Sequence, residues 1–302
     1  MRQPGNRLDW DKDGAAWPHA ATSRFIRSGG FHWHVQVSGK ESAPAMVLLH
    51  GTGASSHSWR NLIPLLADRF RLIVPDLPCH GFTRPDGVAD LSLPGMARAL
   101  ATLFADLSVH PDVIAGHSAG GAIAVALASG PMARPPKRLV AINGAFLPIR
   151  GNRLLSPMAK ALFANPFSAS MFSALSRLTP LGDNLLGSTR SPIDQTGRSL
   201  YQRLLSDPGH VRGALGMMAS WNLDRMDAML RKLTIPVTFI AAEDDPMVPP
   251  DNSAHAAGLA PGSRLVRIRD GGHLLHECQA ETVARVILEA GTTGADKGAD
   301  AA

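Results

Sequence analysis

Short apolar runs and segments with helical spacing alternate along most of the chain. The runs at 45–49, 71–76, 113–115, 139–143, 235–242 and 263–268 are mostly apolar, as expected for strands buried on both faces of a parallel sheet. Segments with helical spacing occupy 59–68, 93–107, 122–129, 210–230 and 274–289. A further run at 31–37 alternates apolar and polar residues, which indicates a half-buried strand. This order predicts an α/β fold with a mostly parallel, doubly wound sheet of about eight strands.

The alternation stops between residue 146 and about residue 207, where no strand pattern is visible. Segments 154–164 and 168–178 are apolar, rich in Met and Phe, and bounded by prolines. They predict a helical cap inserted over the carboxyl edge of the sheet, although ordinary surface helices packed on one another would show the same pattern. We therefore divide the chain into an N-terminal arm (1–24), a first core part (25–145), the cap (146–210), a second core part (211–290) and a disordered tail (291–302).

Composition excludes several classes of protein. The chain has 302 residues, of which 45% are hydrophobic and 18% are charged, which is ordinary for a globular protein with a full core. Its net charge of +5 comes mostly from scattered arginines, so we expect no nucleic-acid partner. Cys79 and Cys278 form no disulfide framework, and no leader or membrane-spanning segment is visible. These features predict a cytoplasmic protein without a transmembrane segment.

A Gly-x-Ser-x-Gly motif at 116–120 lies between a predicted strand and a predicted helix. A sharp turn in that position exposes the Ser118 hydroxyl at the carboxyl end of the strand. It also leaves the Ala119 N–H at the start of a helix, where the dipole favours a developing oxyanion. A glycine-rich turn with a solvent-facing serine would show the same five residues. Whether Ser118 is a nucleophile therefore depends on partner residues elsewhere in the chain.

Two later loops supply such partners at the same edge of the sheet. An acidic run, Glu243-Asp244-Asp245, follows one strand, and Gly272-His273 follows the last strand. In this arrangement His273 accepts the proton of Ser118, and one of the carboxylates orients the imidazole. The order serine, acid, histidine is the order of α/β-hydrolases.

Two groups of histidines allow a metal site as an alternative. His32 and His34 share a face of the 31–37 strand, but a solvent-facing strand edge explains them better because no third ligand is near in sequence. His273, His276 and Glu277 could form a cluster, but Gly272 and the spacing favour the serine–histidine arrangement. We expect His117 to point into the turn or toward the cap. No metal and no cofactor is predicted.

Together these motifs resemble the α/β-hydrolase superfamily over roughly residues 25 to 290. The resemblance rests on segments 50–53, 76–81, 116–120, 245–249 and 272–273. It implies Ser118 as nucleophile, His273 as base and Asp245 as acid, with Asp244 as the alternative acid. It also implies Thr52 and Ala119 as oxyanion donors. Cys79 stands where the family commonly has glycine, which implies either a reactive thiol or a tolerated small residue.

A closer resemblance is to the magnesium chelatase accessory proteins of bacteriochlorophyll gene clusters (BchO type). It rests on segments 49–60, 76–83, 91–100, 217–221 and 272–277. It implies a place in bacteriochlorophyll synthesis for photosynthesis, with a porphyrin or magnesium chelatase subunits as partners. The leading hypothesis is a serine hydrolase that acts on an ester or thioester of a small apolar acid, through an acyl-Ser118 intermediate. The alternative is a non-hydrolytic accessory that binds a porphyrin or the chelatase.

The cap also contains basic residues among its apolar ones, which are Arg150, Arg153, Lys160 and Arg177. We expect one apolar face of the cap helices to pack on the body and the rest to line an entrance. Such a surface suits a flat tetrapyrrole with carboxylate arms, and it equally suits peripheral contact with an anionic membrane.

Overall fold

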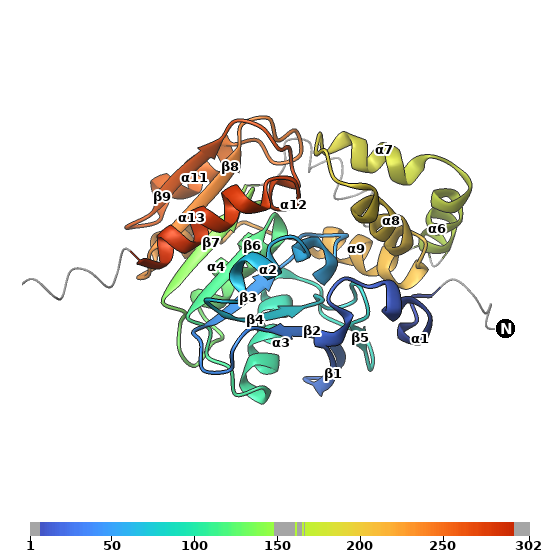
Figure 1. Ribbon diagram of the computed structural model, residues 1–302, viewed down its shortest axis with the longest axis horizontal. Helices are drawn as coiled ribbons and strands as arrows, with labels where there is room; N and C mark the ends of the chain where they lie inside the picture. The colour runs from blue at the N-terminus through green and yellow to red at the C-terminus, as the bar shows by residue number, and fades with distance from the viewer. Residues whose placement is uncertain (1–6, 148–160, 162–164, 166, 293–302) are drawn as a thin grey trace, which may run out of the picture.

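The computed structural model describes residues 7–147, 161, 165 and 167–292, and it contains a nine-stranded sheet (Figure 1). The order is β1-β2-β4-β3-β6-β7-β8-β9, and β5 pairs with β2. Neighbours from β4 to β9 run parallel, whereas β2 pairs antiparallel with β1, β4 and β5. The mostly parallel sheet is therefore confirmed, with nine strands rather than about eight. The strands are β1 (Ser23–Ser28), β2 (Phe31–Ser38), β3 (Ala45–Leu49), β4 (Arg71–Pro75), β5 (Arg84–Pro85), β6 (Val113–His117), β7 (Arg138–Ile142), β8 (Val237–Ala242) and β9 (Arg264–Ile268).

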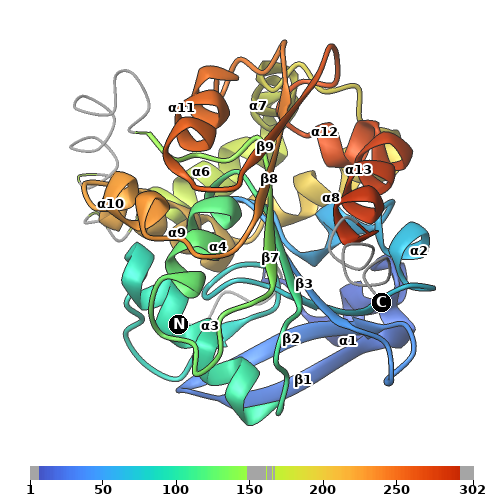
Figure 2. The same ribbon diagram turned by 90° about the vertical axis from the view of Figure 1, so that its left-hand side faces the viewer.

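Helices cover both faces of this sheet, as the doubly wound prediction requires (Figure 2). One face carries α3 (Leu93–Asp106), α4 (Ala119–Ala128), α10 (Met226–Arg231) and α11 (Asp251–Leu259). The other carries α2 (Ile63–Leu66), α12 (Leu275–Cys278) and α13 (Ala280–Thr292). Each layer has its own buried hydrophobic cluster, so the central strands are apolar on both sides. In the described part of the chain, no helix has both the length and the apolar character needed to span a membrane.

Several predicted helices are shorter or broken in the structure. The 59–68 segment is a 3-10 turn, η3 (Ser56–Trp59), followed by one turn of α2. The 210–230 segment divides into α9 (Pro208–Ser220) and α10, and the 274–289 segment divides into α12 and α13. Apolar spacing runs through these breaks because both pieces bury the same side, so periodicity alone does not locate them.

The N-terminal segment packs onto the body through its tryptophans. It forms α1 (Trp10–Asp13), η1 (Gly14–Ala16) and η2 (Ala20–Thr22) before entering β1. The rings of Trp10 and Trp17 both meet Phe82 edge-on, at centroid distances of 5.0 and 4.8 Å. His34 on β2 is fully buried under the rings of Trp10, Phe25 on β1, and Phe82, so the expectation of a solvent-facing edge is wrong. His32 is only partly buried and lies 2.9 Å from Asp86.

The described cap helices lie together beside the sheet (Figure 1). They are α6 (Ser168–Leu178), α7 (Leu181–Ser188), α8 (Gln195–Leu205) and α9. Helix α6 confirms the predicted 168–178 segment. Nearly all of the predicted 154–164 helix, together with Arg150, Arg153 and Lys160, lies outside the described residues.

Helix α6 is oriented opposite to the usual rule. Its buried face consists of small side chains, namely Ser168, Ala169, Ser173 and Ser176. Phe172 is partly buried, whereas Met171, Leu175 and Leu178 (82%) are exposed, as is Phe167 (76%) just before the helix. More of the large apolar set is therefore left exposed in α6 than the sequence suggested.

Helix α8 is attached to the core by a buried polar network. The Tyr201 hydroxyl donates to the Glu277 carboxylate at 2.7 Å, and Arg60 also binds Glu277. Arg60 reaches Asp194, the N-cap of α8, at 2.8 Å. Burial raises the pKa of Glu277, although Arg60 and Tyr201 oppose that shift. Glu277 is thus occupied in joining the cap to the core.

Histidine is unusually abundant in the interior near the carboxyl edge of the sheet. Burial lowers the pKa of six fully buried imidazoles, and that of His80 falls to about 3. They are His50, His57, His80, His117, His210 and His276. The folded protein therefore holds these rings neutral, whereas the unfolded chain protonates them near pH 6.5.

Stability should consequently fall as the pH falls below about 6.5, because the unfolded state then binds more protons than the folded state. Each neutral histidine contributes up to ~1.4 kcal/mol per pH unit to this slope. Urea unfolding at pH 7.5, 6.5 and 5.5 measures how the free energy of unfolding changes with pH. His80→Gln should reduce the slope by up to about one proton, whereas His110→Gln, at an exposed position, should leave it unchanged. A wild-type free energy of unfolding that is flat over this range would contradict the prediction.

Candidate active site

Ser118 occupies a strained turn between β6 and α4. Its backbone has φ 52° and ψ −119°, a conformation that residues with side chains rarely adopt. A Cβ on Gly116 would lie 2.2 Å from the Gly120 carbonyl oxygen, and one on Gly120 would lie 2.2 Å from the Leu49 oxygen. Only glycine at both positions lets α4 start this close to β6 and β3.

The structure joins Ser118, His273 and Asp245 in one hydrogen-bonded series. His273 Nδ1 lies 2.8 Å from Asp245 Oδ2, and its Nε2 lies 3.1 Å from Ser118 Oγ. A carboxylate only accepts, so Nδ1 carries the proton and Nε2 is free to accept the serine proton. The second Asp245 oxygen accepts from the Met247 and Val248 amides, at 2.8 and 3.0 Å.

Asp244, the alternative acid, has a different partner. Its Oδ1 accepts the Gly272 amide at 2.9 Å, which fixes the loop that carries His273. The two neighbouring aspartates therefore hold the same loop, one through its backbone and one through the imidazole.

The predicted oxyanion donors are the backbone amides of Ala119 and Thr52. Ala119 is the first residue of α4, so its N–H has no acceptor within the helix. The Thr52 N–H shares a peptide plane with the Gly51 carbonyl, which accepts from His50 Nδ1 at 2.8 Å. Holding that carbonyl fixes the direction of the Thr52 N–H. A Cβ on Gly51 would lie 3.0 Å from the Ser118 Cβ, so this loop passes close to the serine.

Two residues without an assigned role in the sequence analysis hold this loop. His210 on α9 donates from Nε2 to the Gly53 carbonyl at 3.1 Å and accepts the Gly81 amide at Nδ1. Asp76 accepts from the Ser56 and Phe82 amides, at 2.7 and 2.8 Å, and also from His34. Burial alone would raise the pKa of Asp76, but His34 and these donors hold it well below its ordinary value. A polar residue ending a buried strand was the available signal for Asp76.

His117 and Asn143 contact the backbone of the His273 loop. His117 does not point toward the cap, because its Nε2 donates to the His273 carbonyl at 2.8 Å. Asn143, directly after β7, donates to the carbonyls of Gly272 and His273 at 2.9 Å each. The sequence analysis included Asn143 only as the end of a strand.

The described residues contain no group of three or more His, Cys, Asp or Glu side chains placed to hold a metal ion. His276 instead shares a 2.6 Å hydrogen bond with Ser58, while Glu277 binds Arg60 and Tyr201. The side chains of the proposed His–His–Glu cluster therefore have separate partners.

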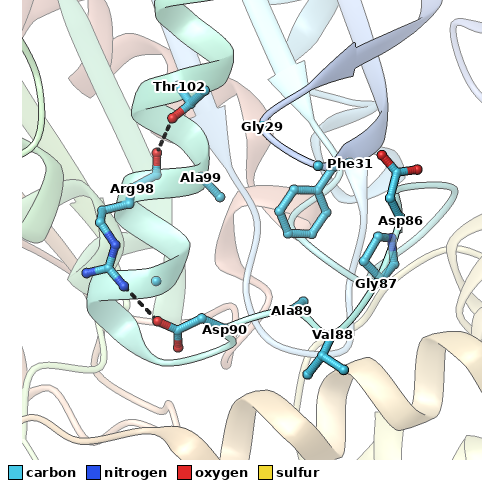
Figure 3. Close-up of a pocket in the computed structure, with 13 residues that line it drawn as sticks. Gly29, Phe31, Asp86, Gly87, Val88, Ala89, Asp90, Arg98, Ala99 and Thr102 are labelled. Atoms are coloured by element: carbon cyan, nitrogen blue, oxygen red, sulfur yellow. Dashed lines mark hydrogen bonds and ion pairs between the residues drawn. The ribbon is translucent and has the colours of Figure 1, made fainter.

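A hollow of about 380 Å³ lies apart from these loops (Figure 3). Its walls come from the β1–β2 turn, residues 85–90 and the first half of α3. Its charged groups have partners: Arg98 pairs with Asp90 at 2.7 Å, and Asp86 pairs with His32. None of the described residues in its wall belongs to the Ser118–His273–Asp245 series.

Comparison with known proteins agrees with this fold. A family model for the alpha/beta hydrolase fold matches residues 44–278, and the chain belongs to that family. An alpha/beta hydrolase fold protein from Burkholderia ambifaria has the same fold, with a TM-score of 0.73 and 21% identity over 88% of this chain and 99% of that one.

Two groups of relatives are more informative about function. The chain is 40% identical to the "Magnesium-chelatase 30 kDa subunit" of Rhodobacter capsulatus over 91% of this chain and 96% of that protein, which confirms the BchO-type resemblance. It is 30% identical to the "Pimeloyl-[acyl-carrier protein] methyl ester esterase" of Stenotrophomonas maltophilia strain K279a, over 84% of this chain and 94% of that protein.

Cys79 adopts the left-handed backbone that the family's glycine would adopt, with φ 63°. Burial raises the pKa of its thiol to about 11, and that of Cys278 to about 12. Thiols that remain protonated at neutral pH are poor nucleophiles. The structure thus favours a tolerated small residue over a reactive thiol.

Both cysteines should therefore resist modification in the folded protein. With a disulfide-exchange reagent at pH 7.5, we expect little reaction within minutes, and two cysteines per chain should react after denaturant is added. In the Cys79→Ser variant, measured in parallel, one cysteine per chain should react. Rapid modification of Cys79 before unfolding would show that its thiol is activated.

Proposed function

We propose that the protein is a serine hydrolase that cleaves an ester or a related acyl bond. The observation that carries this proposal is the hydrogen-bonded series from Ser118 Oγ through the His273 imidazole to Asp245, with Ser118 on a strained turn. A serine hydroxyl is a poor nucleophile unless a positioned base removes its proton, and the 3.1 Å hydrogen bond to His273 Nε2 supports His273 in that role.

The chemistry follows from these positions. Ser118 Oγ attacks the acyl carbon while His273 Nε2 takes its proton, and Asp245 stabilises the resulting imidazolium. The amides of Thr52 and Ala119 bind the oxyanion of the tetrahedral intermediate. His273 then protonates the leaving alkoxide or thiolate, which gives an acyl-Ser118 ester. Water, deprotonated by His273, hydrolyses this ester and restores the serine.

An apolar acyl group fits the surroundings of the oxyanion loop. Met217 on α9 is fully buried, and its sulfur accepts a hydrogen bond from the Thr52 hydroxyl at 3.3 Å. The Thr52 side chain therefore lies against an apolar thioether rather than a charged group, which favours an apolar acyl group. The methyl ester esterases among the relatives support an ester of an aliphatic acid as the substrate class.

A second candidate function rests on the chelatase relative. Identity of 40% over nearly the whole of both chains supports a role beside magnesium chelatase, in bacteriochlorophyll synthesis. In that role the protein binds a porphyrin or chelatase subunits, with or without hydrolysis. The exposed apolar side chains of α6 offer a surface for such a partner or for a membrane.

Labelling with a fluorophosphonate probe tests the nucleophile. We expect the wild type to be labelled and Ser118→Ala to show no labelling, because the Ser118 hydroxyl is the group hydrogen-bonded to His273 Nε2. Ser129→Ala, at the end of α4, serves as the matched control and should be labelled normally. Labelling that persists in Ser118→Ala would refute the assignment.

A binding measurement separates the two candidate functions. Titration of the wild type and of Ser118→Ala with protoporphyrin, followed by absorbance, reports binding independently of hydrolysis. Tetrapyrrole binding by a wild type that hydrolyses no p-nitrophenyl ester would favour the accessory role.

The two aspartates should differ sharply in their effect on turnover. Asp245→Asn removes the carboxylate that sets the His273 tautomer and should lower kcat by about 10³–10⁴. Asp244→Asn keeps an acceptor oxygen for the Gly272 amide and should cost much less. Steady-state kinetics on p-nitrophenyl butyrate provide the comparison, and a larger loss in Asp244→Asn would assign the acid to that residue.

A further inference from the structure

Both backbone polar groups of His273, its N–H and its carbonyl, form hydrogen bonds. Its N–H donates to the Thr189 carbonyl at 2.9 Å, and the following N–H, of Leu274, donates to Ser191 Oγ at 2.7 Å. Both of these partners belong to the segment between α7 and α8. The carbonyls of Gly272 and His273 are bound from the opposite side, by the core.

Asn143 supplies most of that opposing contact. It is 1% exposed, and its Nδ2 donates to both carbonyls at 2.9 Å. Its Oδ1 accepts the Ala242 amide at 2.8 Å, at the end of the strand that leads to Asp245. One side-chain amide therefore connects the loop of the proposed base to the strand of the proposed acid.

These two carbonyls belong to the peptide planes on either side of the His273 Cα. Fixing both planes fixes φ and ψ at His273, and the direction of its Cα–Cβ bond follows from them. The imidazole then needs only its side-chain torsions to reach Ser118 Oγ and Asp245. His117 adds a third donor, but only to the His273 carbonyl.

We propose that Asn143 is a positioning residue that aims the His273 imidazole between Ser118 and Asp245, an inference that rests on the proposed role of His273 as the base. Asparagine suits the position for two reasons. It tolerates the left-handed backbone found there, with φ 46°, and it offers two donors and an acceptor in a small volume. Aspartate has the same shape but cannot donate to either carbonyl.

The test compares Asn143→Gly and Asn143→Asp with the wild type. Glycine keeps the left-handed backbone without strain and removes only the amide, which limits misfolding. Ser108→Gly is the matched control, since Ser108 is exposed and has a similar φ of 52°, in a loop at the opposite edge of the sheet. Kinetics on p-nitrophenyl butyrate, the rate of fluorophosphonate labelling, and the low-field proton NMR signal of His273 Nδ1–H are measured on each folded variant.

We expect Asn143→Gly to lower kcat and the labelling rate by about 10- to 100-fold, with KM changed little, because a displaced base slows the chemical step. The low-field signal should shift or broaden. Asn143→Asp should show the same loss and also move the pH profile upward, because an added negative charge favours the imidazolium. Ser108→Gly should match the wild type in all measurements.

Two results overturn the inference. One is a folded Asn143→Gly whose kcat and low-field signal equal those of the wild type. The other is a loss of activity that disappears after correction for the unfolded fraction. Failure of the proposed function is a different result: the wild type then shows neither hydrolysis nor Ser118 labelling. In that case the NMR signal alone decides whether Asn143 orients His273.

Discussion

The close approach of three backbone segments at Ser118 is the constraint on which the rest of the structure depends. Strand β6 lies at the centre of the parallel sheet between β3 and β7, and α4 begins immediately after it. Gly116, Gly120 and the Leu49 carbonyl meet there at distances that leave no room for a methyl group. Any displacement of this turn would move the two neighbouring strands, so the position of the serine is fixed by the packing of the whole sheet.

The other groups of the site reach Ser118 because every parallel strand ends at the same edge. The strands β3, β4, β6, β7, β8 and β9 are followed by Thr52, Asp76, Ser118, Asn143, Asp245 and His273 respectively. Ser118, Asn143 and Asp245, as far as 155 positions from His273 in the chain, therefore belong to one hydrogen-bonded assembly with the His273 loop. Neutral histidines contribute to it repeatedly, since a buried imidazole can donate on one side and accept on the other without carrying charge.

Seven of the nine strands, the helical layers on both faces and the loops that meet at Ser118 were predictable because each depends on a local pattern, whereas β1 and β5 were missed. An apolar run, a Gly-x-Ser-x-Gly turn and a Gly-His pair each indicate a local structure from only a few neighbouring residues. The function of Asn143 was not predictable, because its amide acts on carbonyls about 130 positions later and nothing near it in sequence indicates this. His34 was misassigned for the same reason, since its burial depends on aromatic rings from other segments of the chain. The breaks in the later helices escaped detection because apolar spacing continues across them.

Helix α6 has a consequence for how sequences of this family can diverge. It packs on its neighbouring helices through serines and an alanine, so its exposed methionine and leucines add little to the free energy of folding. Replacing them with other residues would leave the sheet and the Ser118 turn undisturbed. The outer surface of α6 can thus change its chemistry at little cost to folding, whereas the turn at Ser118 has no room for a side chain on Gly116 or Gly120. The same fold can in this way present different surfaces to partners while the packing around Ser118 stays as it is.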